Sequence, residues 1–392
     1  MPISPQKTEC CGCTACMTIC PVKAITMKKD KEGFFYPEID KNRCVNCGQC
    51  EKVCLFLKGY KGIESGFEQE IKAVKLNSLE DRRKSQSGGT ASAITSYVLN
   101  HSGIVYGAVL GTDFITRHTR IDKLEDKEKL RGSKYVQSDM GQTFNDVRMD
   151  LRKGNLVLFT GTGCQIAGLK NFLRQARVPM NHLITMDIIC HGVPSPKIFE
   201  DCRQEIIHKH PGKMESIDFR NKRRFGWHSH ELTAVIDGKE YNENAYTKLF
   251  YSHVILRQSC YHCPMTNLNR SSDITTCDCW GIEKVMPDFD DNNGVSLIMI
   301  NSAKGAEVWE SIKNQFDVRD IDVKSVLQPQ MQYPNKRPDN RDKFWKDYNE
   351  KGIRYVIFHY AEGGYKGAIK RNLGPLKPVL RPIYHGIKKI IH

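Results

Sequence analysis

Two cysteine runs near the start of the chain decide its fold: Cys10-x2-Cys13-x2-Cys16-x3-Cys20-Pro21 and Cys44-x2-Cys47-x2-Cys50-x3-Cys54. In each run, three cysteines stand three positions apart and a fourth follows four positions later. Three thiolates at this spacing wrap a short loop around one corner of a four-iron cube, and the fourth ligand must come from elsewhere. Because the run occurs twice, each copy can supply the fourth ligand of the other.

The two runs predict a pair of [4Fe–4S] clusters, with the spacing of bacterial two-cluster ferredoxins. The predicted ligands are Cys10, Cys13, Cys16 and Cys54 for the first cluster, and Cys44, Cys47, Cys50 and Cys20 for the second. Cys11 lies outside the pattern and is expected to be a free thiol. Cys-x2-Cys pairs also bind zinc, but the repeated triple and the Cys20-Pro21 pair favour iron. Leu55 stands where a second proline is usual, which removes no ligand.

Length and cysteine usage bound the class of protein. The chain has 392 residues, enough for two or three domains of about 150 residues each. Sixteen cysteines could indicate a secreted disulfide scaffold, but nine fall in the first 54 residues at cluster spacing, which favours a reducing cytoplasm. No signal-peptide pattern opens the sequence, and no apolar run approaches the ~18 residues of a membrane span.

The net charge of +14 is spread along the chain, except at residues 220–224 and in the segment after Glu362. A nucleic-acid partner is one interpretation of a basic chain. A basic face is more often simply solvated, or meets an acidic redox partner or an anionic cofactor, and we favour these interpretations. The end of the chain, with Ile383, Ile387 and Ile390, could lie on a membrane surface or dock a partner; a loosely ordered basic tail is equally consistent.

The next segments predict strands, turns and helices in alternation. Short strands are expected at 24–28, 34–39, 71–76 and 104–110, and a helix ends near Asn100. The turn Ser87-Gly88-Gly89 lies between a strand and that helix, so its backbone N–H groups could bind an anion. Serine and glycine are also ordinary helix caps. Lys134 could reach a cofactor phosphate, although a solvated lysine is the default.

A parallel sheet with crossover helices is predicted further along. The strands are expected at 155–159 and 183–189, and the helices at 165–177 and 195–208. Ligands of such sheets bind at the carboxyl ends of the strands, where Cys164 and Cys190 lie. The turn before Cys164 lacks the full dinucleotide-binding fingerprint.

The second half of the chain adds short strands and two more cysteines. Strands are expected at 216–220 and 230–236, followed by a helix at 245–256 and by Cys260-x2-Cys263. With Cys164 and Cys190, these cysteines could form a third [4Fe–4S] site. Buried free cysteines are common, so spacing alone leaves both interpretations open.

The order of these motifs resembles that of the family of coenzyme F-420 hydrogenase/dehydrogenase beta subunits, in the form of a bacterial member with a fused two-cluster ferredoxin. The resemblance covers about residues 1–305. It rests on the two cysteine runs, Ser87-Gly88-Gly89, Gly161-Thr162-Gly163-Cys164-Gln165, Cys190-His191-Gly192-Val193-Pro194-Ser195, Asp218-Phe219-Arg220, Gly226-Trp227, Cys260-x2-Cys263, Asp273-Ile274 and Asp278-x-Trp280-Gly281.

The resemblance implies FAD as the working cofactor and a cluster beside it. The implied ligands of that cluster are Cys164, Cys190, Cys260 and Cys263. The implied flavin contacts are Ser87, Gly88, Gly89 and Lys134, with Asn221 and Lys222 as further candidates. Cys277 and Cys279 stand where the family has glycine and an aromatic residue, so they are not expected to be ligands. Gly163 replaces a frequent proline.

The predicted fold class is α/β, or α+β overall. Its expected parts are a ferredoxin module at 1–60, two regions of an α/β flavin-binding domain with added short strands at 70–150 and 151–316, and a basic extension at 317–392. The expected function is an iron–sulfur flavoprotein oxidoreductase that passes electrons between a low-potential carrier and a small organic substrate. A non-catalytic electron-transfer subunit is the alternative, and a zinc-containing nucleic-acid binder is a third hypothesis. No catalytic residue is predicted, although His191 and His228 are candidate proton donors.

Overall fold

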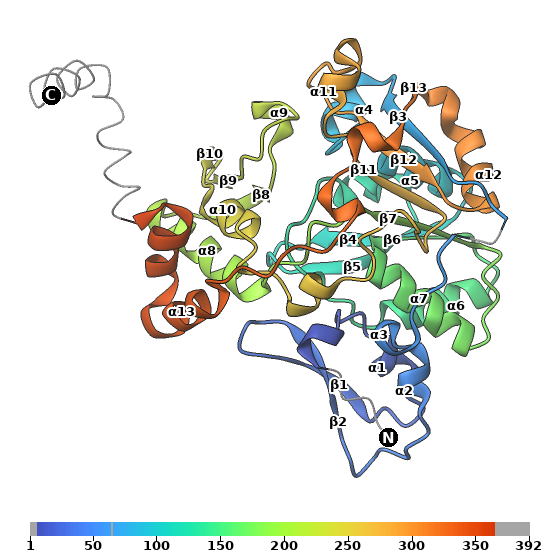
Figure 1. Cartoon of the computed structure of the whole chain (residues 1–392), viewed down its shortest axis with the longest axis horizontal. Coiled ribbons are helices and arrows are strands. Elements are labelled where there is room, and N and C mark those ends of the chain that lie inside the picture. Colours follow the sequence, from blue (N-terminus) through green and yellow to red (C-terminus); the bar gives the residue numbers. More distant parts are fainter. Residues whose placement is uncertain (1–5, 64–65, 365–392) are drawn as a thin grey trace, which may run out of the picture.

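An eight-stranded mixed sheet forms the centre of the protein, in a computed structural model that describes residues 6–63 and 66–364 (Figure 1). The strands, in spatial order, are β13 (Phe316–Asp320), β3 (Glu70–Leu76), β12 (Ser296–Ile300), β11 (Ile274–Asp278), β7 (Leu183–Ile188), β6 (Val157–Thr162), β4 (Ile104–Leu110) and β5 (Thr116–Ile121). The middle strands β4, β6, β7 and β11 pair in parallel, and for β6 and β7 this confirms the prediction. The remaining pairs are antiparallel, and the sequence did not predict β11 or β13.

Helices cover both faces of this sheet, which explains why inner strands such as β4 and β12 are almost continuously apolar. On β6, Leu158 packs with α5 (Thr90–Asn100) and α12 (Ala303–Ile312) on one face. Its neighbours Val157 and Phe159 pack with α6 (Thr143–Arg152) and α7 (Gly163–Gln175) on the other face. This is the alternation that a pleated strand imposes.

The N-terminal module packs below the sheet, against α7 (Figure 1). It holds an antiparallel hairpin of β1 (Ile25–Lys29) and β2 (Phe35–Ile39), close to the predicted strands. Its three short helices are α1 (Ala15–Ile19), α2 (Gln49–Val53) and α3 (Leu55–Lys58).

The tip of the hairpin is fixed to the main domain. Arg341 donates from Nη1 to Glu32 Oε1 at 2.9 Å, and the Ser195 hydroxyl donates to the Glu32 carbonyl at 2.5 Å. A Cβ atom on Gly33 would lie 2.6 Å from Lys197 Cβ, so the two backbones are in close contact. The module therefore contacts the main domain through the tip of its hairpin as well as along α7.

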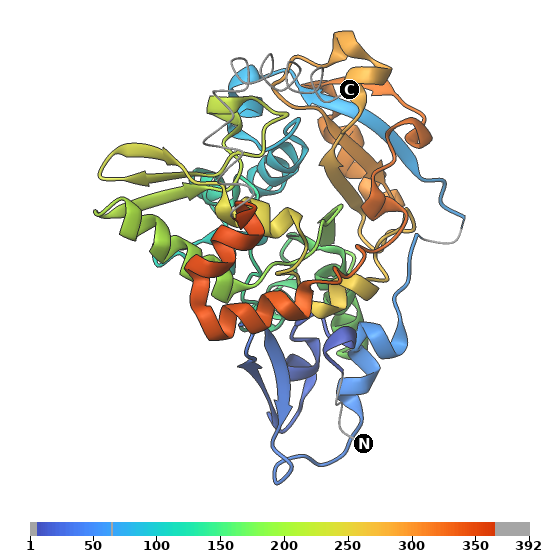
Figure 2. The ribbon, with the colours of Figure 1, turned by 60° about the vertical axis from the view of Figure 1, so that its left-hand side comes forward.

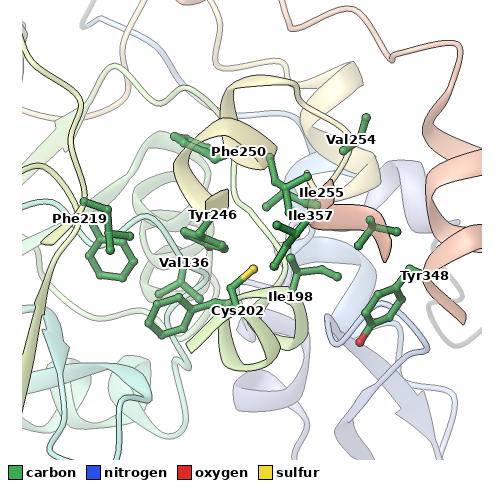
Figure 3. Packing of buried hydrophobic residues seen from close by; sticks show 14 of the residues in the cluster. Val136, Ile198, Cys202, Phe219, Tyr246, Phe250, Val254, Ile255, Tyr348 and Ile357 are labelled. Atoms are coloured by element: carbon green, nitrogen blue, oxygen red, sulfur yellow. The ribbon is translucent and has the colours of Figure 1, made fainter. Parts of the chain in front are cut away.

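A second, smaller sheet forms a lobe beside the first (Figure 2). Its order is β10 (Lys239–Asn242), β9 (Thr233–Ile236) and β8 (Met214–Asp218), all antiparallel. The sequence predicted strands at 216–220 and 230–236, close to β8 and β9, but not the return strand β10. Helices α8 (Pro196–Lys209), α10 (Ala245–Tyr251) and α13 (Arg341–Val356) cover it, and Figure 3 shows side chains such as Tyr246, Cys202 and Ile357 packed between them. The helix expected at 245–256 ends at Tyr251 because the chain turns at His253, whose φ is 63°.

The segment expected to be a polar extension has a more ordered structure than predicted. Phe316–Asp320 completes an edge of the large sheet, and α13 buries Phe344 and Trp345 in the small lobe. The predicted amphipathic end lies outside the described residues. Smaller helices of the described part are α4 (Leu79–Lys84), α9 (Lys222–Phe225), α11 (Ile282–Val285) and several 3-10 turns. None of the described helices combines the length and apolarity that a bilayer span requires.

Candidate cluster and cofactor sites

One predicted ligand set lines a single cavity at the outer end of the N-terminal module. The cavity wall includes Cys20, Cys44, Cys47 and Cys50, together with apolar side chains such as Ile25 and Ile39. Gly48 has a φ of 68° and precedes α2, so the chain turns sharply between the second and third cysteines of the run. The Cys20 sulfur accepts a hydrogen bond from the Ala24 amide at 3.3 Å. We name these four cysteines the outer set.

The other predicted set lies toward the main domain, and we name Cys10, Cys13, Cys16 and Cys54 the inner set. Burial, followed by the nearby thiols of Cys10 and Cys54, raises the pKa of Cys16. Cys13 faces α7 so closely that a Cβ atom on Gly168 would lie 2.7 Å from its sulfur. The absence of a side chain at Gly168 therefore allows the module to approach this helix.

Tetrahedral zinc, with Zn–S bonds of about 2.3 Å, holds its thiolates roughly 3.8 Å apart. Within residues 6–63 and 66–364, no three cysteine sulfurs lie within 4.8 Å of one another, so none of the described sets has the close spacing of a tetrahedral zinc site. Sets of four thiols are the donors that a four-iron cluster would require.

The main domain gathers a third set from distant segments, and we name Cys164, Cys190, Cys260 and Cys263 the third set. Cys164 lies in the first turn of α7, Cys190 follows β7, and Cys260 lies on the 3-10 helix η3 (Gln258–His262). Burial of the thiol, and to a smaller degree the nearby thiol of Cys164, raises the pKa of Cys190 to about 12. Burial of the thiol, and to a smaller degree the thiols of Cys190 and Cys263, raises the pKa of Cys260. The four thiols therefore lie close enough to influence one another.

Backbone and hydroxyl groups already surround the third set with donors. The Gly192 amide donates to Cys190 Sγ at 3.4 Å, and the Val193 amide donates to Cys260 Sγ at 3.3 Å. The Thr162 hydroxyl lies 3.2 Å from Cys164 Sγ. Such donors stabilise negative charge on sulfur, which is what a thiolate ligand of a cluster needs.

Cys11 lies between the inner set and the third set. Contact with Cys13 raises the pKa of Cys11, and Cys164 lies against its thiol as well. Leu55, Ala167 and Met265 enclose this region with apolar surface. The sequence placed Cys11 outside both runs, and no pattern in it predicts this position between two ligand sets.

Arg257 is a buried residue of the main domain that donates hydrogen bonds to the N-terminal module. Its side chain is 1% exposed, and it donates to the carbonyls of Cys10 at 2.6 Å and Phe35 at 2.8 Å. It also donates to the Gln137 side chain at 3.1 Å and lies 3.5 Å from the sulfur of Cys10. A buried cation at this point offsets the negative charge of thiolate ligands. Sequence reasoning missed this residue.

A second buried cation supports the loop that carries the third set. Arg270 donates to Asp187 at 2.5 Å, and to the carbonyl of Asn267 in the loop after Cys263. Both ionic side chains are at most 2% exposed. A Cβ atom on Gly163 would lie 2.9 Å from Arg270 Nη2 and from Asp187 Oδ2. The glycine that replaces a frequent proline therefore leaves room for this ion pair.

The candidate flavin residues come from three segments that meet at one place. Lys222 Nζ donates to the Ser87 carbonyl at 3.1 Å, which joins α9 to the Ser87-Gly88-Gly89 turn. The Gln86 side chain donates to the Arg220 carbonyl at 3.0 Å and accepts from the Ser133 amide at 3.3 Å. Lys134 follows Ser133 in the chain and Asn221 follows Arg220, so both candidates lie directly beside these contacts. Asn221 itself caps α9 by accepting from the Arg224 amide.

The donors around this turn fit an anionic cofactor. Thr90, the first residue of α5, has a buried hydroxyl without a hydrogen-bond partner among the described residues. Burial lowers the pKa of Lys134 to about 8 and that of Lys222 to about 7. Each of these two ammonium groups donates to three backbone carbonyls. Their donors are therefore already used within the protein, and the Thr90 hydroxyl is an unpaired side-chain donor at this turn among the described residues.

Two regions of the chain match family models. Residues 154–324 match the model for the C terminus of the coenzyme F420 hydrogenase/dehydrogenase beta subunit, and residues 9–56 match the 4Fe-4S dicluster domain. Residues 154–324 are therefore similar to this family of beta subunits. All four members of the third set lie inside that region, and all eight cysteines of the inner and outer sets lie inside the dicluster match.

Known relatives share parts of the chain. The F subunit of F(420)H(2) dehydrogenase from Methanosarcina mazei is 24% identical over 208 residues, which are 50% of this chain and 58% of the relative. The I 2 subunit of NADH-quinone oxidoreductase from Geobacter metallireducens is 40% identical over 57 residues, 13% of this chain and 44% of the relative. The chain thus spans less than two thirds of each. A chain of the F420-reducing [NiFe] hydrogenase complex of Methanosarcina barkeri is 18% identical with a TM-score of 0.48, covering 76% of this chain and 92% of that one.

The two candidate proton donors lie near the cysteines of the main domain but have partners of their own. His191 Nε2 is 2.8 Å from His253 Nε2, and burial, then His253, lowers the pKa of His191 to about 4. His228 Nε2 is 2.6 Å from Asp290. Of the two cysteines expected not to be ligands, Cys277 lies 3.6 Å from the Gln328 amide and Cys279 is buried in the apolar core.

Proposed function

We propose that the protein is an iron–sulfur flavoprotein oxidoreductase that passes electrons between a ferredoxin-type carrier and an organic substrate. The twelve cysteines of the outer, inner and third sets would hold three [4Fe–4S] clusters, and the Ser87 turn would hold FAD. Four-iron clusters exchange single electrons and flavins exchange hydride, so together they connect a one-electron carrier to two-electron chemistry.

The observation that carries this proposal is the position of α7 between two ligand sets. Cys164 of the third set and Gly168, which contacts Cys13 of the inner set, are four residues apart on the helix. Residues at this spacing share one helix face and are about 6 Å apart. The chain therefore brings the two sets to within about one helical turn, with Cys11 between them and apolar side chains that exclude water.

FAD is supported by the meeting of the three segments around Ser87. Their contribution would be to bind and orient: the start of α5 and the unpaired Thr90 hydroxyl would donate to an anionic group, with Lys134 and Lys222 close by. The guanidinium carbon of Arg220 lies 5.0 Å from the centre of the Trp280 ring. Arg220 is also paired with Asp278, so this buried cation lies against an aromatic ring.

A non-catalytic electron-transfer subunit is the second candidate. It is favoured by the names of both relatives, each of which is a subunit of a larger redox enzyme. The two candidates differ in whether the purified chain alone converts an organic substrate when a reduced ferredoxin or dithionite is supplied.

Anaerobic purification followed by iron, sulfide and flavin analysis tests the proposal. We expect about twelve irons and one FAD per chain, since each cubane holds four irons. A result of about eight irons would remove the third cluster, and zinc in place of iron would overturn the proposal entirely. A full iron content without any flavin would favour the electron-transfer subunit.

A further inference from the structure

The two ligand sets of the N-terminal module have different surroundings. The inner set lies against the main domain, where Gly168 contacts Cys13 and the buried Arg257 contacts Cys10. In the outer set, Cys47 is exposed, and no described residue outside the module lines the cavity that the set shares. If electrons leave the module through the inner set, the outer set is the side on which they are exchanged with another molecule.

The loop that carries the outer set has an exposed apolar centre. Val45, between Cys44 and Cys47, is 60% exposed, the highest exposure among the large apolar side chains of the described residues. A single exposed valine is ordinary on a protein surface. Its position, within the loop that wraps the proposed cluster, is what makes it a point of close approach for a redox partner.

Positive charge surrounds this apolar centre. Lys41 and Arg43 are exposed on the same loop, and Lys23 is exposed on the neighbouring loop after Cys20. Arg43 donates to the Val22 carbonyl at 2.9 Å, which holds the two loops together. Across the described ranges, none of these three cations forms an ion pair with a carboxylate. The nearest acid in the chain, Asp40, accepts from the Asn42 amide.

We propose that Lys23, Lys41, Arg43 and Val45 form the docking surface for an acidic one-electron carrier protein of the ferredoxin type. The inference rests on the proposed function, because only a chain that holds both module clusters would use it. Charge complementarity steers encounters and fixes orientation, and the valine offers a contact from which water can be excluded. Each encounter would oxidise the carrier by one electron and reduce this protein by one, without any bond being made or broken.

Stopped-flow reduction of the anaerobic holoprotein tests the surface. The probe is an acidic two-cluster ferredoxin, reduced beforehand and mixed at low and at high ionic strength. For Lys41→Glu/Arg43→Glu we expect a second-order rate constant reduced by about ten-fold at low salt, with a difference that shrinks at high salt because salt screens exposed charges. Val45→Ser should slow the reaction to a similar degree at both salt concentrations.

The matched control is Lys313→Glu/Arg319→Glu, which changes the net charge equally at the opposite end of the molecule (Figure 1). It should react like the unaltered protein. Equal slowing by both double variants would overturn the docking surface, because net charge alone would then explain the effect. No slowing by Lys41→Glu/Arg43→Glu would overturn it as well.

Two further measurements keep the outcomes distinct. If substitution beside Cys44 lowers the iron content, Lys23→Glu, which lies outside the cysteine loop, provides the same test. Dithionite reports on the clusters without a protein partner. Failure of dithionite to reduce the holoprotein would contradict the proposed function, whereas reduction by dithionite but not by the ferredoxin would contradict only the docking surface.

Discussion

The N-terminal module and the main domain both gather cysteines, but over very different lengths of chain. The module collects eight between residues 10 and 54, from two short loops that repeat one spacing. The third set spans Cys164 to Cys263 and depends on the ends of β6 and β7, on η3 and on the loop that follows it. A site built from short loops can be predicted from the local sequence. A site built from strand ends forms only when the sheet has folded, so local sequence does not reveal it.

The largest expected difference concerns the iron content. Cys260→Ser should lower it from about twelve to about eight, because one cubane of four irons loses a ligand. Cys47→Ser should remove iron from the module and leave the third set loaded. Cys277→Ser, at a half-buried cysteine outside all three sets, is the control and should keep the full content. Iron and sulfide analysis with electron paramagnetic resonance separates these cases, and equal losses in all three variants would remove the distinction.

The next effect concerns the Arg270–Asp187 ion pair, which supports the loop after Cys263 of the third set. Arg270→Met leaves Asp187 buried without its partner, which costs about 3–5 kcal/mol of unfolding free energy for a pair of this kind. Arg117→Met breaks the exposed pair with Asp113 and should leave the free energy of unfolding nearly unchanged. Denaturant unfolding under anaerobic conditions measures both. Similar values for the two variants would show that Arg270 does not stabilise the fold through its buried partner.

A smaller effect is expected at the contact between the two regions. Gly168→Ala adds a Cβ atom where Cys13 Sγ lies 2.7 Å away, so the module must move outward. The iron content should stay near that of the unaltered protein, but reduction of the third cluster after reduction of the module should slow several-fold. Rapid-freeze electron paramagnetic resonance follows this step. Arg174→Ala, elsewhere on α7, is the control, and equal rates for the two variants would contradict a role for Gly168.

The smallest effect is a pH dependence of stability that arises away from the cysteines. Burial lowers the pKa of His118 to about 4, below the value of about 6.5 in an unfolded chain. Its contribution is therefore complete above pH 6.5 and is lost as the pH falls toward 4, by at most about 3 kcal/mol. Urea midpoints at pH 7.5 and 5 should differ less in His118→Asn than in the unaltered protein.

The sequence predicts the two regions unequally well for a physical reason. The repeated spacing identified the module, and strand–helix alternation identified the parallel middle of the sheet, because both are local patterns. The four cysteines of the third set were singled out by spacing only as one of two open interpretations. Arg257 was not foreseen: it binds the carbonyl of Cys10 across 247 positions, and no local pattern marks a lysine or arginine that becomes buried. Gly168, Arg270 and the position of Cys11 were missed for the same reason.

The double attachment of the hairpin tip, through Arg341 and Ser195, has a consequence for the rate-limiting step. A domain held only by a linker must diffuse to its partner surface before an electron can cross, so its turnover slows as the solvent becomes more viscous. A module fixed at its tip and along α7 needs no such search. We expect internal electron transfer to be insensitive to added glycerol or sucrose, and only the encounter with an external carrier to depend on viscosity.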